Sequence, residues 1–145
     1  GASYSYILID CPPSLSLLTI MALVASNSLV VPLQTEFFAL EGLTQLMKTI
    51  ERVKNNLNTN LLIRGILLTM YDKRNKLSSQ VEKEARDYFK EKVYQTVVPR
   101  NVRLSEAPSH GVPVLLYDRT CPGSISYFNF TEEFLNQEKI METAA

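Results

Sequence analysis

Short apolar runs alternate with longer segments of helical periodicity along this chain, and this alternation constrains the fold more than any other feature. The runs are rich in β-branched residues and lie at 6–9, 29–33, 62–70 and 93–98. Buried strands that alternate with helices over short connections are typical of a parallel sheet with right-handed crossovers. We therefore predict an α/β fold, a parallel sheet with flanking helices, in which residues 1–145 form a single domain.

Helical segments are expected between and after these runs, at 14–25, 40–57, from Ser79 to about 89, and from Ser124 to about Met141. The first is apolar along most of its length and should be largely buried. The third should begin at Ser79, because Ser79 and Glu82 have the spacing of a capping box. Residues 104–117 contain two prolines and a glycine, which predict a loop with about one helical turn.

Polar residues follow each apolar run. In a parallel sheet the carboxyl ends of the strands lie at one edge, and ligands bind beyond that edge. We expect Asp10, Gln34, residues 69–74 and residues 99–103 to emerge there together. One acidic group among several basic and polar groups is the mixture that a nucleotide with Mg²⁺ requires.

Asp10 directly follows the apolar run Tyr6–Ile9, which we expect to be a buried strand. A carboxylate at a strand end suits Mg²⁺, which takes oxygen ligands and keeps several waters. Acidic residues also favour helix N-termini, so Asp10 could instead cap the following helix. From the residues alone, both interpretations stay open.

Charge is unevenly distributed along a chain whose formal net charge is zero. Residues 48–103 hold 13 basic and 6 acidic side chains, and the rest of the chain is acidic. This segregation is compatible with an anionic partner for the middle of the chain. Charge counting alone favours the alternative that these residues lie on solvated helix faces.

The two cysteines, Cys11 and Cys121, are too few for a disulfide framework and fit a reducing cytoplasm, with Cys11 as a small buried residue. One histidine and no C-x-x-C pair argue against a zinc site. We see no signal peptide, and polar residues interrupt the apolar stretch 15–31, so we expect a cytoplasmic protein without a membrane partner.

The segment ILIDCPPSLSLLTIMALVAS resembles the Walker B strand and following switch of the ParA/Soj/MinD family of P-loop ATPases. The segments FFALEGLTQLMKTI and LLTMYDKRNKLSSQVEKEARDYFKEKVYQTVVPRNVRLSEAPSHGVPVLLYD are similar to the ParA/Soj branch, which partitions chromosomes and plasmids. The resemblance extends to Asp118 and implies the fold of a P-loop NTPase.

The resemblance also implies roles for individual residues. Asp10 would help to hold Mg²⁺, and the residues at two strand ends would border the adenine of ATP: Thr69, Met70, Pro99 and Asn101. Non-specific DNA contact is implied for four basic residues: Arg74, Lys76, Arg100 and Arg103. Arg103 could instead pair with Glu106, three residues further along the same turn.

The chain departs from the family in three respects. Its five glycines are too scattered to form the G-x-x-x-x-G-K-[ST] phosphate loop, so the resemblance implies an incomplete fold from the Walker B strand onward. Val112 and Leu116 stand where Soj-like proteins often carry a basic residue. After Asp118 the similarity is loose, and the tail is acidic.

Three functions follow from the resemblance. The first is the C-terminal part of a ParA/Soj-like ATPase, which forms an ATP-dependent dimer on the nucleoid and is stimulated by a ParB-like partner. Since phosphoryl transfer depends on the phosphate loop, we expect this chain alone neither to bind ATP tightly nor to hydrolyse it. The second is a non-catalytic dimerisation and DNA-binding module. The third, MinD-like cell-division positioning at a membrane, is opposed by the acidic tail.

Overall fold

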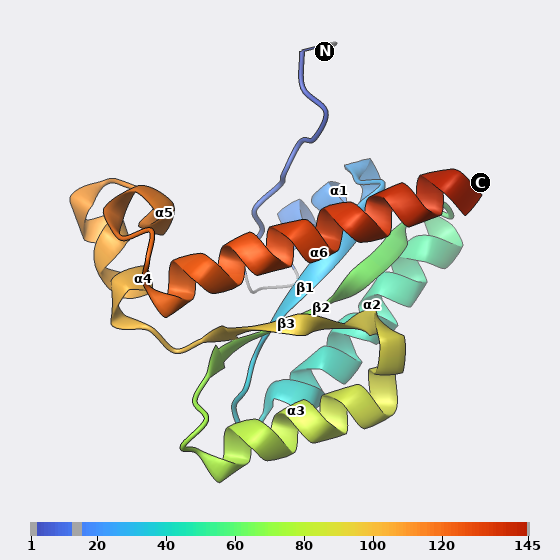
Figure 1. Ribbon diagram of the computed structural model, residues 1–145. Helices are drawn as coiled ribbons and strands as arrows, with labels where there is room; N and C mark the ends of the chain where they lie inside the picture. The colour runs from blue at the N-terminus through green and yellow to red at the C-terminus, as the bar shows by residue number, and fades with distance from the viewer. Residues whose placement is uncertain (1–2, 13–15, 145) are drawn as a thin grey trace. The chain divides into compact units, whose positions relative to one another are not determined.

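Three parallel strands, in the order β1-β2-β3, form the sheet of this protein (Figure 1). The computed structural model describes residues 3–12 and 16–144. Strand β1 spans Ser28–Gln34, β2 spans Leu62–Tyr71 and β3 spans Val93–Pro99. These bounds confirm three of the four predicted strands and, with the flanking helices, the predicted α/β class.

The chain divides into two compact units. The first unit comprises Gly1–Leu29 and Gly42–Arg64, and the second comprises Val30–Glu41 and Gly65–Ala145. Strands β1 and β2 begin in the first unit and end in the second. The carboxyl ends of all three strands therefore belong to the second unit.

Helix α1 (Leu17–Ala25) and most of helix α2 (Ala39–Asn56) form the first unit. Its core consists of Leu23, Ile50, Val53 and Leu61. The Asn58 amide donates hydrogen bonds to the carbonyl oxygens of Leu23, at 3.0 Å, and Ser26, at 2.8 Å. These bonds satisfy carbonyls at the end of α1 that have no partner within the helix.

The first predicted strand is wrong. Residues 6–9 have no strand conformation, and the exposed fraction of Leu8 is 92%. An apolar run becomes a buried strand only where a neighbouring strand pairs with it and side chains cover both faces. The three-stranded sheet of the described residues does not include this run.

The expected burial around this segment is wrong for the same reason. Cys11 is exposed, and α1 buries only Thr19 and Leu23 among its described side chains. Leu17 and Leu18 are exposed. The helix itself is confirmed from Leu17, whereas residues 14 and 15 lie outside the described residues.

Helices α3 (Lys76–Phe89) and α6 (Pro122–Ala144) are the long helices of the second unit. Figure 1 shows α6 running beside β3. The core of this unit consists of Leu67, Tyr94 and Val98 on the strands, packed against aromatic side chains of α6: Tyr127, Phe130 and Phe134. The aromatic side chains of α6 thus cover one face of strands β2 and β3.

Two helix starts differ from the sequence prediction. Helix α3 begins three residues before Ser79, because the side chain of Asn75 accepts the N–H of Leu77 and caps it. In α6, Ser124 and Ser126 are buried, whereas Ile125 and Phe128 are exposed. Helix α6 begins at Pro122, two residues before the predicted start at Ser124.

Short helices replace most of the loop that was predicted for residues 104–117. They are α4 (Val102–Glu106), the 3-10 helix η2 (Ala107–His110) and α5 (Val114–Tyr117). Gly111 ends η2 with φ 67°, a left-handed conformation that suits glycine. Within the described ranges, no helix is long and apolar enough to cross a membrane.

Candidate functional site

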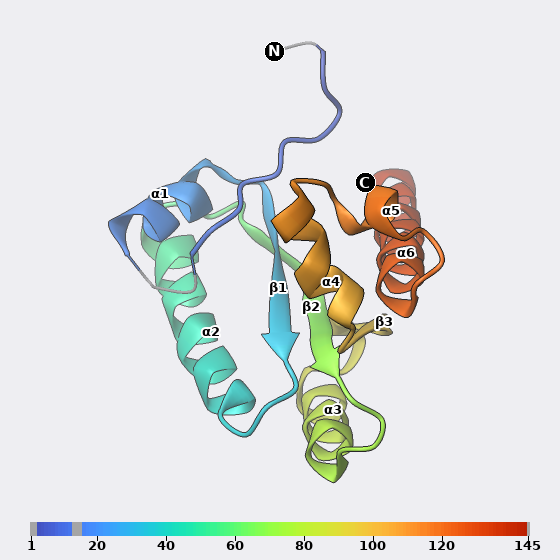
Figure 2. The same ribbon diagram turned by 90° about the vertical axis from the view of Figure 1, so that its left-hand side faces the viewer.

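Backbone hydrogen bonds hold the carboxyl ends of the three strands side by side. The N–H of Thr35 donates to the carbonyl of Thr69 at 3.1 Å, which joins the ends of β1 and β2. The N–H of Arg100 donates to the carbonyl of Tyr71 at 2.9 Å, which joins the ends of β2 and β3. Figure 2 shows the arrowheads of β1 and β2 pointing the same way. The sequence-predicted segments 69–74 and 99–103 therefore lie at one edge of the sheet.

Met70 interrupts β2 near that edge. Its φ of 54° is in the left-handed region, which is strained for a residue with a side chain. Such a conformation costs on the order of 1–2 kcal/mol and is held by the surrounding structure. The hydroxyl of Thr35 lies 3.3 Å from both the Thr69 and the Met70 carbonyl oxygens, and it supplies part of that support.

Asn101 lies just beyond β3, as the N-cap residue of α4. Its side-chain Oδ1 is buried and accepts no hydrogen bond among the described residues. A buried acceptor without a donor costs about 1–3 kcal/mol, so native structures rarely contain one. This oxygen is a buried acceptor for which the described residues supply no donor.

Two of the four predicted DNA-contacting residues are engaged by carboxylates. Arg74 donates from Nε and Nη2 to the two oxygens of Asp72, at 3.1 and 3.0 Å. This side-chain hydrogen bonding, together with the backbone N–H of Arg74, lowers the pKa of Asp72 to about 2. The Arg74 side chain is 90% exposed, so a stronger anionic partner can compete for it.

Arg103 is held more closely than Arg74. Its Nη1 donates to Glu106 at 2.8 Å, and its Nε lies 3.5 Å from an oxygen of Asp118. The hydrogen bond to Glu106 raises the pKa of Arg103. The alternative pairing of Arg103 with Glu106 is therefore present. Within the described ranges, no ion pair is found for Lys76 or Arg100.

Asp10, the predicted metal ligand, belongs to the first unit and is exposed. Over residues 3–12 and 16–144, no three His, Cys, Asp or Glu side chains group closely enough to hold a metal ion. A single carboxylate fits Mg²⁺ only as part of a set that includes waters and substrate phosphates. The residues that the structure describes therefore do not by themselves complete a metal site.

Three features of this edge were missed by sequence reasoning. Thr35 and Ser78 are both 2% exposed, and their hydroxyl oxygens lie 3.3 Å apart, although 43 residues separate them. No pattern in the sequence indicates this pair. The third feature is a pair of exposed aromatic rings, Phe37 and Phe38, whose centroids are 5.0 Å apart. Two adjacent phenylalanines after a polar strand end were the available signal.

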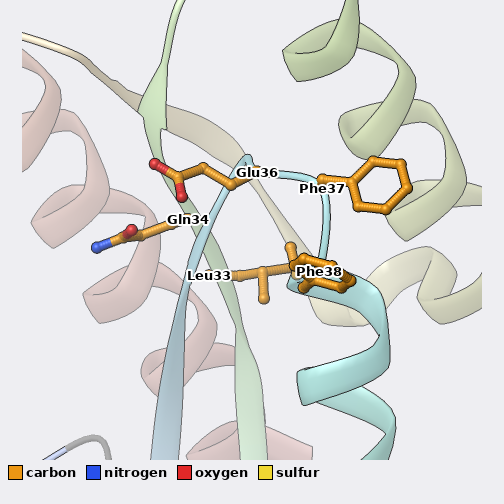
Figure 3. A pocket seen from close by; sticks show the side chains of 6 residues that line it. Leu33, Gln34, Glu36, Phe37 and Phe38 are labelled. Atoms are coloured by element: carbon orange, nitrogen blue, oxygen red, sulfur yellow. The ribbon is translucent and has the colours of Figure 1, made fainter.

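The two phenylalanines line a shallow hollow of about 300 Å³ after β1, with Leu33, Gln34, Glu36 and Ala39. Figure 3 shows Leu33 and Phe38 on one side of the strand and Gln34 on the other. The lining of the hollow therefore combines apolar side chains with the polar side chains of Gln34 and Glu36. Such a surface suits contact with another polypeptide better than binding of a small polar ligand.

Comparisons with known proteins identify close relatives of this sequence. A family model described as an AAA domain matches residues 1–63. The chain is 58% identical over 142 residues to the chromosome partitioning protein ParA of Caulobacter vibrioides, an alignment of 98% of this chain and 53% of that protein. It is 57% identical to the sporulation initiation inhibitor protein Soj of Bacillus subtilis, over 90% of this chain and 52% of that protein. The chain thus spans about half the length of the curated relatives it matches.

Solved structures agree with the assigned fold. The cobyrinic acid a,c-diamide synthase of Mycobacterium smegmatis with bound ADP and magnesium matches with a TM-score of 0.71 and 32% identity, over 90% of this chain and 46% of that one. The cell division ATPase MinD of Pyrococcus furiosus matches with a TM-score of 0.74, over 94% of this chain and 54% of that one. At 19% identity, the likeness to MinD shows the fold alone.

Proposed function

This chain belongs to the ParA/Soj family of chromosome-partitioning proteins, and we propose that it is the C-terminal portion of such an ATPase. In this proposal the carboxyl edge of the sheet receives the base of ATP, and the basic residues beside it contact DNA. The phosphates require a loop that these 145 residues do not contain.

The buried Oδ1 of Asn101 is the observation that carries the nucleotide part of the proposal. The exocyclic amino group of adenine is a hydrogen-bond donor, and an amide oxygen is a suitable acceptor for it. Pro99, at the end of β3, and Thr69 and Met70, at the end of β2, lie at the same edge and would border the base.

Asp10 is proposed to contribute to Mg²⁺ binding, through water, when the phosphates of the nucleotide are present. The metal would supply charge neutralisation at the phosphates. Asp10 is one exposed carboxylate without a group of further ligands in the described ranges. We therefore expect no tight binding of Mg²⁺ or ATP, and no hydrolysis, by this chain alone.

DNA contact is proposed through Lys76 and Arg100 first, and through Arg74 and Arg103 after they exchange their carboxylate partners for phosphate. Phosphate contacts of this kind are independent of base sequence and weaken with salt. The neighbouring acidic groups, Asp72 and Glu106, set how readily the two paired arginines exchange.

Self-association and binding of a ParB-like protein complete the proposal. The exposed rings of Phe37 and Phe38 and the strand β1, which has a neighbour on one side only in the described sheet, support contact with another chain. The partner is proposed to be a second copy or the half of the family fold that carries the phosphate loop. We propose a cytoplasmic location, on the nucleoid when DNA is bound.

A titration tests the nucleotide part. Fluorescently labelled ATP with Mg²⁺ is added to this chain alone, and then to this chain mixed with the other half of Caulobacter vibrioides ParA. We expect binding in the micromolar range only in the mixture. Micromolar binding by the chain alone, or no binding by a mixture that forms a stable complex, would contradict the proposal.

A non-catalytic DNA-binding module is the second candidate, and the absence of an ion pair at Lys76 and Arg100 in the described structure favours it. A gel shift with random-sequence duplex DNA over a salt series separates the two candidates. Binding by this chain without ATP supports the module. Binding that requires both ATP and the other half supports the divided ATPase.

A further inference from the structure

Two buried hydroxyl groups join the end of β1, the end of β2 and the start of α3. The Oγ1 of Thr35 lies 3.3 Å from the carbonyl oxygens of Thr69 and Met70 and 3.3 Å from the Oγ of Ser78. Both hydroxyl-bearing residues are 2% exposed. Water is therefore not available to replace these contacts.

On its β2 side, the Thr35 hydroxyl supports the irregular strand end at Met70. The Thr69 carbonyl already accepts the N–H of Thr35, and the hydroxyl adds a donor within reach of that carbonyl and of the next one. Met70, whose carbonyl is the second of these, has the left-handed φ of 54°. The hydroxyl proton of Thr35 can thus be donated to a carbonyl oxygen at Met70, where the β2 backbone departs from the extended conformation.

On its α3 side, the network reaches the loop that carries Arg74. The Oγ of Ser78 accepts the backbone N–H of Asp72 at 3.4 Å and donates to the Thr35 carbonyl at 3.5 Å. Asp72 in turn accepts hydrogen bonds from the Arg74 backbone and guanidinium. An unbroken series of contacts therefore runs from Met70 through Thr35, Ser78 and Asp72 to Arg74.

We infer that Thr35 is a positioning residue whose hydroxyl couples the irregular end of β2, at Thr69 and Met70, to the Asp72–Arg74 loop. The inference deepens the proposed function, on which its relevance to nucleotide and DNA rests. It gives the chain a route by which a base seated against Met70 would change the presentation of Arg74. The coupling itself is a property of this chain without any ligand.

Thr35→Val tests the inference, because it removes the hydroxyl and leaves a side chain of similar shape. Thr35→Ser is the matched control, because it keeps the hydroxyl and removes only the methyl group. The first readout is amide hydrogen exchange at Asp72, measured by NMR relative to the exchange of the α6 amides. The second readout is the NMR titration of the Asp72 carboxyl group.

We expect Thr35→Val to accelerate exchange at Asp72 at least about tenfold relative to α6, and Thr35→Ser to resemble the wild type. The pKa of Asp72, about 2 in the wild type, should rise in Thr35→Val toward the ordinary value of about 3.9. A general loss of stability would accelerate all amides together and would leave the titration of Asp72 unchanged. That result would overturn the inference.

Ser78→Ala provides a second variant if Thr35→Val does not fold. It keeps the bonds between Thr35 and the β2 carbonyls and removes the acceptor for the Asp72 N–H. Exchange should accelerate at Asp72 and stay unchanged at Met70; unchanged exchange at Asp72 would overturn the inference. These measurements use no nucleotide or DNA, so a failure of ligand binding by the wild type would count against the proposed function alone.

Discussion

The carboxylate of Glu133 on α6 accepts the backbone N–H of Thr96 at 2.9 Å with one oxygen, and that of the preceding residue, Gln95, at 2.7 Å with the other. Arg86 on α3 donates to the carbonyls of Tyr94 and Gln95. Two helices thus satisfy polar backbone groups of β3, a strand with a neighbour on one side only in the described sheet. Because free strand edges recruit other chains, these side chains make β3 the less favourable edge for association.

Glu133→Gln should destabilise the protein by about 2 kcal/mol. The substitution replaces one of the two charged acceptor oxygens with an NH2 group, which only donates, and it therefore leaves one backbone N–H without an acceptor. Glu132→Gln is the matched control, because Glu132 is exposed and its replacement leaves the Glu133 carboxylate with both of its backbone hydrogen bonds. Urea denaturation measures both free energies of unfolding. Equal values for the two variants would show that the Glu133 contacts contribute no net stability.

Gly65→Ala and Gly42→Ala should shift stability in opposite directions. A methyl group at Gly65 would lie 2.5 Å from Cε2 of Tyr94 and 3.0 Å from the Lys92 carbonyl, and Tyr94 is buried. Overpacking of this kind costs about 1–3 kcal/mol. At Gly42, within α2, nothing lies within 4 Å, so alanine should stabilise the helix by up to about 1 kcal/mol. Thermal unfolding of both variants tests the pair, and a stable Gly65→Ala protein would contradict the packing described.

Asp72 should make stability depend on pH in the acid range. Its folded-state pKa, about 2, is below the ordinary value of about 3.9 in an unfolded chain. Its stabilising contribution is therefore complete above about pH 4 and is lost as the pH falls through about 2. The free energies of unfolding of the wild type and Asp72→Asn should differ at pH 6 and converge toward pH 2. A constant difference over this range would show that the Asp72–Arg74 pair does not set that pKa.

The basic residues should contribute unequally to any DNA affinity. Arg100→Ala and Lys76→Ala should each reduce the slope of log affinity against log salt by about 1, because each removes one phosphate contact. Arg103→Ala should reduce it less, since Glu106 and Asp118 already engage Arg103. Lys83→Ala is the control, because Lys83 pairs with Asp87 along α3. Fluorescence anisotropy over a salt series measures the slopes, and an equal effect of Lys83→Ala would rule out a localised DNA surface.

The sequence predicted the regular elements whose signals are local. The apolar runs at 29–33, 62–70 and 93–98 became strands, because each found a neighbour in the sheet. The run at 6–9 carries an equally strong signal but is not a strand. An apolar pattern indicates that a segment can be buried, but it does not indicate whether a neighbouring strand is present to pair with it. The start of α3 was misplaced because two polar residues, Asn75 and Ser79, both carry a capping signal.

The candidate site was predictable where it follows from strand ends. The joining of Tyr71 to Arg100 follows from the rule that parallel strands end at one edge. The burial of the Asn101 oxygen and the contact between Thr35 and Ser78 depend on side-chain packing between distant segments, so no local pattern reports them.

A comparison of the affinities for ATP and GTP tests whether the carboxyl edge of the sheet recognises adenine. It requires this chain in complex with the other half of a ParA relative, because the chain alone is not expected to bind either nucleotide. Asn101 Oδ1 would accept from the adenine amino group, whereas guanine presents an oxygen at that position and would leave both acceptors unsatisfied. We predict that the complex prefers ATP and that Asn101→Ala removes most of the preference. An unchanged preference for ATP in Asn101→Ala would contradict the account.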